Sequence, residues 1–237
     1  MSNLVSKTIL VTGASSGIGR SIAEKLLQQH IVIGASRNIN KFTTTHAHFS
    51  AVELDLGRLD SIAVTAKKVQ SAYPNLNTVI FAAGYGQFGG LEQFSYAQIN
   101  ELISVNLIAQ MYLTKALLPK LKQQPHSHLI YIGSEAALKG SRNGTVYCAS
   151  KFALRGFTQA LRDECAKSSV RVSLINPGMV TTPFFDNLDF APGKNYGQAL
   201  RAEDIADTVN YILQANPACQ IDEINLSPLH KVIDFKK

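Results

Sequence analysis

The sequence predicts an α/β fold in which a doubly wound parallel sheet carries helices on both faces. Short apolar runs suited to strands alternate along the chain with longer segments of helical period. The runs are apolar along their whole length, which is typical of strands covered on both faces, and the alternation favours parallel strands joined by right-handed crossovers. A glycine-rich turn follows the first run. We therefore expect a Rossmann-like sheet of seven parallel strands in a single domain.

Seven apolar runs are the expected strands, and they lie at Thr8–Val11, Ile31–Ala35, Ala51–Leu54, Thr78–Ala82, Leu129–Ile132, Val170–Ile175 and Gln220–Asn225. Five segments of helical period lie between them, at Arg20–Gln29, Leu59–Ser71, Tyr96–Lys122, Thr145–Lys167 and Ala202–Gln214. The one long stretch without a pattern runs from Gly178 to Leu200. Because such a stretch in a compact domain is usually functional or mobile, we expect a substrate lid at about residues 179–200.

Composition limits the class of protein. The 237 residues are 46% hydrophobic, which allows one sizeable core, and no linker divides the chain, so residues 1–237 are expected to form a single domain. The formal charge of +6 is scattered, which favours a solvated surface over nucleic-acid binding. No apolar run approaches the roughly 18 residues of a membrane span, and the N-terminus lacks the order of a signal peptide. With its three cysteines far apart, the chain is expected to be cytoplasmic.

Two histidine pairs, His46-x-His48 and His126-x-His128, have a spacing that a metal site can use. Neither pair has a carboxylate or cysteine at a ligand spacing, and both fall in expected loops. We therefore expect surface histidines and no metal site.

A glycine-rich turn, Thr12-Gly13-Ala14-Ser15-Ser16-Gly17-Ile18-Gly19, follows the first strand and opens the first helix. Glycines permit a tight turn and close backbone approach, while the helix N-terminus offers unpaired amides and the positive end of its dipole to a pyrophosphate. An ordinary turn rich in small residues is the alternative, but the position directly after the first strand favours a dinucleotide. The expected cofactor-binding residues here are Gly13, Ser15, Ser16, Gly17, Ile18 and Gly19.

The end of the second strand reads Ala35-Ser36-Arg37-Asn38, and it bears on the choice of dinucleotide. No carboxylate stands there to repel a 2′-phosphate, and the Arg37 guanidinium can bind a phosphate through two parallel hydrogen bonds. We expect NADP(H) rather than NAD(H), the alternative being that Arg37 is a solvated loop arginine. Asp55 and Leu56 end the third strand, where the carboxylate either accepts hydrogen bonds from an adenine amino group or caps the next helix.

Tyr147 and Lys151 are four residues apart in an expected helix, so they share one face of it. Lowering a phenol pKa from about 10 to about 7 takes about 4 kcal/mol of preferential phenolate stabilisation. An ammonium about 5 Å away contributes roughly 3 kcal/mol at an effective dielectric of about 20, and an oxidised nicotinamide ring adds a similar amount, less the cost of desolvation. Tyr147 could then exchange a proton near neutral pH while hydride moves to or from the nicotinamide. The alternative is a half-buried tyrosine beside a surface lysine.

Further polar groups accompany this pair. Ser134 ends the fifth strand, Asn176-Pro177-Gly178 ends the sixth, and Asn106 shares a helical stripe with apolar residues. Ends of parallel strands on one side of a sheet are where ligands bind. Ser134 could donate to a substrate oxygen or only cap the chain as it leaves the sheet. Asn106 could equally be a structural amide, which needs hydrogen-bonding partners if it is buried.

In this order the motifs closely resemble those of the short, single-domain branch of the short-chain dehydrogenase/reductases, over essentially the whole chain. Thr12-Gly13-x3-Gly17-x-Gly19 resembles the cofactor turn of that family, and Tyr147-x3-Lys151 resembles its catalytic pair. The resemblance implies a general acid/base at Tyr147, with Lys151 lowering its pKa and binding the nicotinamide-ribose hydroxyls. Ser134 would polarise the carbonyl, and Asn106 would support a water relay to Lys151. The segment implied to meet the nicotinamide includes Pro177, Gly178, Val180 and Thr182.

One departure from the family pattern lies after the fourth strand. Where the family usually has Asn-Asn-Ala-Gly or Asn-Ala-Ala-Gly, this chain has Phe81-Ala82-Ala83-Gly84. The loss of the asparagine affects side-chain support around that strand, while Ala83 and Gly84 still let the backbone approach the adenosine ribose. We expect cofactor binding to survive.

These features predict an NADP-dependent oxidoreductase that transfers a hydride between the nicotinamide and a carbonyl or secondary alcohol of a small or medium organic molecule. A 3-oxoacyl-carrier-protein reductase is a narrower alternative, because the basic surface could help dock an acidic carrier. A non-catalytic NADP-binding regulatory protein is another, supported only by Phe81. The resemblance also implies a homodimer or homotetramer built on the long helices around Asn106 and Tyr147.

The expected lid carries large apolar side chains, namely Phe184, Phe185, Leu188, Phe190 and Tyr196. They favour an apolar or mixed substrate, although each could equally serve only to pack the lid onto the domain. Further candidates for the pocket are Gln87, Phe88, Lys139 and Arg142.

Overall fold

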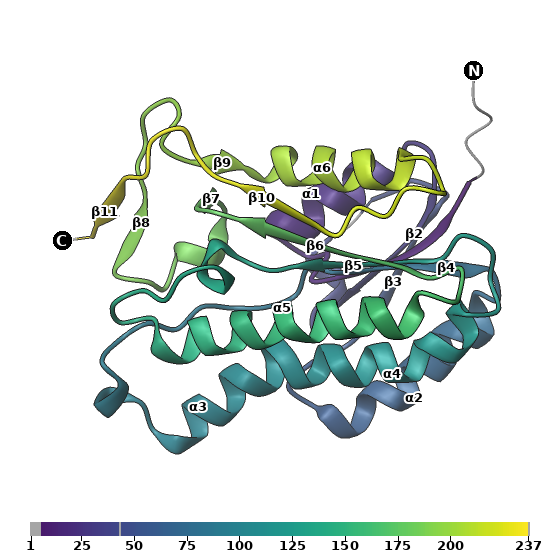
Figure 1. The fold of residues 1–237 in the computed structure, drawn as a ribbon, viewed down its shortest axis with the longest axis horizontal. Coiled ribbons are helices and arrows are strands. Elements are labelled where there is room, and N and C mark those ends of the chain that lie inside the picture. Colours follow the sequence, from purple (N-terminus) through teal and green to yellow (C-terminus); the bar gives the residue numbers. More distant parts are fainter. Residues whose placement is uncertain (1–5, 43, 237) are drawn as a thin grey trace.

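A seven-stranded sheet forms the centre of the protein, as a computed structural model that describes residues 6–42 and 44–236 shows (Figure 1). Its strands are β1 (Thr8–Thr12), β2 (Ile31–Ser36), β3 (Phe49–Glu53), β4 (Leu76–Phe81), β5 (His128–Ile132), β6 (Arg171–Pro177) and β10 (Glu223–Leu226). They are all parallel and lie in the order β10-β6-β5-β4-β1-β2-β3. The order reverses between β1 and β4, and in such sheets ligands bind outside the carboxyl ends of the strands at the reversal.

Helices cover both faces of this sheet (Figure 1). On one face lie α1 (Gly17–Leu26) and α6 (Ala202–Gln214), and on the other lie α2 (Leu59–Ala72), α4 (Ala109–Leu121) and α5 (Thr145–Cys165). The core is accordingly divided in two: Leu10 of β1 belongs to the cluster under α2, α4 and α5, while its neighbours Ile9 and Val11 belong to the cluster under α1 and α6. This alternation is what a strand buried on both faces requires. The predicted doubly wound, single-domain fold is confirmed.

Element boundaries differ from the predicted ones at a few places. The first helix begins at Gly17 rather than Arg20, so the last glycines of the turn form its first turn. Strand β6 continues to Pro177, so Asn176 lies inside the strand rather than after it. The long helix predicted from Tyr96 is interrupted: α3 (Tyr96–Ile103) passes through a π-helical turn (Ser104–Ile108) into α4.

The helical run Tyr96–Leu121 is long enough to cross a membrane, and one 18-residue window of it has a mean hydropathy of 1.2. In the structure it lies in the helical layer, where α4 packs against α2 and α3 packs against α5 (Figure 1).

The stretch from Gly178 to Leu200 shows no pattern in the sequence, yet it contains short strands in the structure. It contains β7 (Val180–Thr181), which pairs with β9 (Leu200–Arg201), and β8 (Phe190–Pro192), which pairs antiparallel with β11 (Ile233–Phe235). The partner of β8 is the C-terminal segment, about 40 residues further along the chain, so local sequence offered no signal for it (Figure 1).

His128 was expected at the surface and is instead buried at the start of β5. Its Nε2 lies 2.9 Å from Ser173 Oγ, and because that hydroxyl donates to the Ile221 carbonyl, the imidazole is the donor to Ser173. Burial lowers the pKa of His128 well below its ordinary value, so the ring is neutral. His46, His48 and His126 are exposed, and no three metal-ligating side chains gather among the residues that the structure describes.

Phe81, the departure from the family pattern, is fully buried at the end of β4. Its ring stacks on Tyr131 of β5, with 4.3 Å between centroids and 3° between planes. The Tyr131 hydroxyl lies 2.6 Å from Thr114 Oγ1, which in turn donates to the Gln110 carbonyl. A stacked pair and a hydroxyl chain thus join β4 and β5 to α4 at this point.

Replacement of Phe81 by Asn, the residue usual in the family, is expected to destabilise the protein. The amide would lose the stacked contact and leave a cavity beside Tyr131, for which large-to-small changes in a core typically cost about 3–5 kcal/mol. Urea denaturation of wild type and variant measures this. Phe81→Leu, which keeps an apolar side chain, should lose about half as much or less. A Phe81→Asn variant as stable as wild type would show that the amide finds partners at the end of β4.

Candidate active site

The glycine turn joins β1 to α1 at the carboxyl edge of the sheet. Gly13 and Gly17 have φ of +71° and +52°, a region that favours glycine. A Cβ at Gly13 would lie 2.9 Å from the Ala83 Cα, so the turn packs directly on the chain that leaves β4. Ser16 begins α1 without a side-chain cap, and the first turn holds no acidic residue. Bare amides at a helix N-terminus fit the pyrophosphate of a dinucleotide.

Thr12 ties the ends of β1 and β4 together. Its Oγ1 accepts hydrogen bonds from the amides of Ala82 and Ala83, each at 3.2 Å. This positions Ala83 and the exposed Gly84 beside the turn, where both are expected to approach the cofactor. The other residues of the turn differ in exposure: Gly19 is buried, Ser15 and Ile18 are half-buried, and Ser16 is exposed.

Tyr147 and Lys151 lie side by side on the inner face of α5, 7% and 5% exposed. The Lys151 Nζ is 5.8 Å from the centroid of the Tyr147 ring and donates to the Ile132 carbonyl at 3.2 Å. The two side chains are therefore neighbours, as their spacing predicted. Both are buried, which excludes the alternative of a surface lysine.

The expected lowering of the tyrosine pKa is not found in the protein alone. Burial raises the pKa of Tyr147 to about 12, although a hydrogen bond with Ser134 opposes the shift. Burial also lowers the pKa of Lys151 to about 8. The sequence argument required an oxidised nicotinamide as a second cation and gave the desolvation cost no magnitude, and in the protein alone the desolvation of the phenolate is the larger effect. In the neutral range Tyr147 is thus a protonated phenol beside a cationic lysine.

Asn106 lies in the π-helical turn and is completely buried. Its Oδ1 accepts from the Tyr85 amide at 3.1 Å and its Nδ2 donates to the Tyr85 carbonyl at 2.9 Å. The side chain therefore holds the segment that follows Gly84. A Cβ at Gly84 would lie 3.0 Å from Asn106 Oδ1 and 3.9 Å from Lys151 Nζ, which places the three residues together.

Gln110 supports Asn106 and was not singled out in the sequence. Its Nε2 donates to the Asn106 carbonyl at 2.9 Å and to the Ala83 carbonyl at 3.4 Å. The only available signal was a second amide one helical turn after Asn106.

Ser134 follows β5 and opens a short 3₁₀ turn, where its Oγ accepts from the Ala136 amide at 3.1 Å. Its own amide donates to Asn176 Oδ1 at 3.3 Å. Asn176, which sequence reasoning treated only as part of a strand end, also donates to Glu223 Oε1 at 2.9 Å, and Glu223 pairs with Arg155 of α5 at 2.9 Å. A buried amide therefore joins Ser134 to the helix that carries Tyr147.

The segment after β6 passes over the glycine turn. Pro177 ends the strand, and the Gly178 amide donates to the Leu226 carbonyl at 2.7 Å. Val180 is buried, and a Cβ at Gly17 would lie 3.3 Å from the Thr182 Cβ. The segment expected to meet the nicotinamide thus faces the turn expected to bind the pyrophosphate.

Arg37, Asp55 and Leu56 lie at the other end of this edge. Arg37 and Asp55 line a groove of about 690 Å³ between β3 and α2 that also contains Arg58. Asp55 Oδ1 accepts from the Gly57 amide at 2.9 Å and closes a turn two residues before α2, so it is not the cap of that helix. Leu56 packs into the core at 6% exposure.

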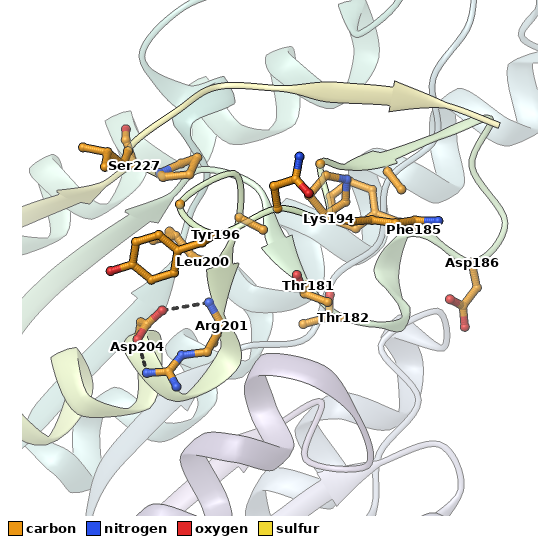
Figure 2. A pocket seen from close by; sticks show the side chains of 18 of the residues that line it. Thr181, Thr182, Phe185, Asp186, Lys194, Tyr196, Leu200, Arg201, Asp204 and Ser227 are labelled. Carbon is orange, nitrogen blue, oxygen red and sulfur yellow. Dashed lines mark hydrogen bonds and ion pairs between the residues drawn. The ribbon is translucent and has the colours of Figure 1, made fainter.

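A second cavity, of about 880 Å³, lies behind the lid (Figure 2). Tyr196 lines it and is 97% exposed, so this residue does not belong to the face of the lid that meets Tyr147, contrary to expectation. Figure 2 also shows Arg201 bonded to Asp204 at the start of α6, with Thr181 and Thr182 beside it because β7 pairs with β9.

The family model described as short chain dehydrogenase matches residues 7–191. The chain belongs to this family. An uncharacterized oxidoreductase of Staphylococcus epidermidis is 30% identical over 234 residues, 97% of this chain and 100% of the relative. One from Staphylococcus aureus is 31% identical over 235 residues, with the same coverage. The protein is accordingly an oxidoreductase of the short-chain dehydrogenase family.

Solved structures of short-chain dehydrogenases agree with this assignment. An alcohol dehydrogenase from Thermococcus sibiricus, complexed with 5-hydroxy-NADP, has a TM-score of 0.86 at 26% identity and covers 98% of this chain and 100% of its own. A metagenomic short-chain oxidoreductase in complex with NADP has a TM-score of 0.79 at 30% identity, covering 97% and 100%.

Replacement of Lys151 by Met is expected to change how stability depends on pH. Burial lowers the pKa of Lys151 from 10.5 to about 8, so the unfolded chain binds more protons than the folded one between these pH values. Lys151 therefore costs the wild type stability at neutral pH, and this cost disappears as pH rises through that window. A shift of this size corresponds to about 3 kcal/mol.

Urea denaturation of wild type and Lys151→Met at several pH values across this window measures the effect. The stability of the wild type relative to the variant should rise by up to about 3 kcal/mol. Lys115→Met, at an exposed position of α4, is the control and should give no such rise. If the free energies of unfolding of wild type and Lys151→Met change with pH in parallel, the lowered pKa of Lys151 is contradicted.

Proposed function

We propose that this protein is an NADP-dependent oxidoreductase that interconverts a carbonyl and a secondary alcohol on a small or medium organic molecule. The observation that carries the proposal is the convergence of Tyr147, Lys151 and Ser134 beside the glycine turn. Two family members solved with NADP-type ligands support the cofactor class.

In the proposed reaction, bound NADP(H) supplies or accepts the hydride. Tyr147 gives its proton to the carbonyl oxygen during reduction and takes it back during oxidation. Because the pKa of Tyr147 is raised to about 12, the phenol keeps its proton at neutral pH, which favours reduction. Lys151 stabilises the phenolate that remains after the transfer, since its ammonium is charged below about pH 8. Ser134, which hydrogen bonds with the phenol, is placed to donate to the same substrate oxygen.

The proposed cofactor lies along the carboxyl edge of the sheet. The turn from Gly13 to Gly19 would bind the pyrophosphate, and the segment from Pro177 to Thr182 would cover the nicotinamide. Arg37 would bind the 2′-phosphate, since its guanidinium lines the groove between β3 and α2 together with that of Arg58. The Lys151 amine would reach the ribose hydroxyls.

The regulatory alternative rested on Phe81 alone. That residue packs against Tyr131 in the core, and the polar residues of the site remain together. We therefore favour the enzyme. We further propose a homo-oligomer built on α4 and α5, because these helices leave Met111, Tyr112 and Phe152 exposed by 38%, 48% and 44%.

Replacement of Tyr147 by Phe is expected to lower kcat about 100- to 10,000-fold, because the variant lacks the proton donor. NADPH oxidation with a panel of ketones, diketones and 3-oxoacyl thioesters measures the rate, and NADPH fluorescence checks that the cofactor still binds. Tyr211→Phe, on the exposed side of α6, is the matched control and should keep full activity. An undiminished rate in Tyr147→Phe would rule out the mechanism.

Replacement of Arg37 by Ala is expected to weaken NADPH binding by about 10- to 100-fold, the range for loss of hydrogen bonds to a charged group. NADH affinity should stay unchanged, since NADH has no 2′-phosphate. Lys41→Ala removes one exposed charge nearby and serves as the control. A wild type that binds NADH more tightly than NADPH would refute the cofactor preference.

A further inference from the structure

Tyr147 and four phenylalanine side chains form a closed circle of aromatic contacts. Tyr147 contacts Phe88 with 5.1 Å between ring centroids, and Phe88 contacts Phe190 of the lid at 5.0 Å. Phe190 contacts Phe185 at 5.8 Å, Phe185 contacts Phe184 at 5.0 Å, and Phe184 returns to Tyr147 at 6.1 Å. The lid therefore meets the site through aromatic rings.

Gly86 forms the floor on which two of these rings meet. A Cβ at Gly86 would lie 2.8 Å from the Phe88 ring and would collide with the ring of Phe184. Bare backbone at this position lets both rings approach. The result is a narrow slot between Gly86, Phe88 and Tyr147, and the ring of Phe184 fills it in this structure.

Apolar and aromatic side chains pack around the slot. The cluster around Tyr147 comprises Leu102, Val146 and the half-buried side chains packed on them, all of them apolar or aromatic in the part of the chain that the structure describes. Lys151 is a cation beside the slot, with its Nζ 5.8 Å from the Tyr147 ring centroid, and it donates to the Ile132 carbonyl. Two lysines of the C-terminal segment are already engaged, because Lys231 bonds Glu135 at 2.6 Å and Lys236 donates to the Phe185 and Asp186 carbonyls. A substrate carboxylate next to the reacting carbon would therefore find no free cation among these groups beyond Lys151.

We propose that the slot between Gly86, Phe88 and Tyr147 is the substrate subsite and that it takes a planar aromatic group attached directly to the reacting carbonyl. Phe184 occupies the place of that group and moves out of it when substrate binds. An aryl ketone or aryl aldehyde, or the corresponding benzylic alcohol, is then the substrate class. This inference rests on the proposed function. An aromatic substrate ring would keep the ring contacts that Phe184 now makes with Phe88 and Tyr147.

The test compares two ketones of similar size, acetophenone and cyclohexyl methyl ketone, in NADPH oxidation. Wild type should have a kcat/KM for acetophenone about tenfold or more above that for the non-planar ketone. Benzoylformate, which carries a carboxylate in place of the methyl group, should be poorer than acetophenone by a similar factor. Equal or reversed ratios would overturn the proposal.

Two variants should move the acetophenone KM in opposite directions. Phe88→Ala removes one wall and should raise KM about tenfold, with Phe88→Leu as a milder variant that keeps an apolar side chain. Phe184→Ala empties the slot and should lower KM, because no ring has to leave before substrate enters. Tyr211→Ala, on the exposed side of α6, is the control. Unchanged KM values in Phe88→Ala and Phe184→Ala would overturn the subsite.

Failure of this inference is distinguishable from failure of the proposed function. Turnover of non-aromatic carbonyls without an aromatic preference would leave the proposed function and remove the subsite. If no carbonyl is turned over, calorimetric titration of acetophenone into the protein with NADP decides. If acetophenone binds and its affinity falls about tenfold in Phe88→Ala, the subsite stands although the proposed activity fails. If acetophenone does not bind, the subsite is overturned.

Discussion

The burial of Lys151 is the constraint on which the rest of the site depends. An ammonium inside a protein loses its solvation by water, and the pKa of Lys151 falls to about 8 as a result. Its amine donates to the Ile132 carbonyl, which can accept because β5 ends at this residue. The cation is thus held by backbone at the edge of the sheet. Its position relative to Tyr147 is therefore set by how α5 packs on β5.

The ends of four strands are joined by side chains that bond to backbone. Thr12 joins β1 to the chain leaving β4, Asn106 holds the residue after Gly84, and Asn176 holds the residue that follows β5. Each of these bonds uses an amide or hydroxyl that is nearly or fully buried, so breaking one would leave an unsatisfied group. These hydrogen bonds hold residues that are far apart in the sequence together at the carboxyl edge of the sheet. The proposed cofactor site lies at this edge.

The sequence predicted the fold well, because fully apolar runs and a glycine turn are local signals of a parallel sheet covered on both faces. It also predicted that Tyr147 and Lys151 are neighbours, since helical spacing is local too. It missed what depends on tertiary packing: the raised pKa of Tyr147, which comes from burial, and the buried His128, whose partner Ser173 lies on the next strand. Gln110 escaped notice for the same reason.

The C-terminal segment decides whether the circle of aromatic contacts that includes Tyr147 can form. Its exposed pair, Lys231 with Glu135, is 66% and 34% exposed, and pairs of that kind contribute about 0–1 kcal/mol. The backbone contributes more: β11 pairs with β8 over three positions, and the Lys236 amide donates to the Asp189 carbonyl at 2.7 Å. Phe190 lies in that paired strand and contacts Phe88. The pairing of two short strands, rather than the ion pair, therefore places Phe190 against Phe88.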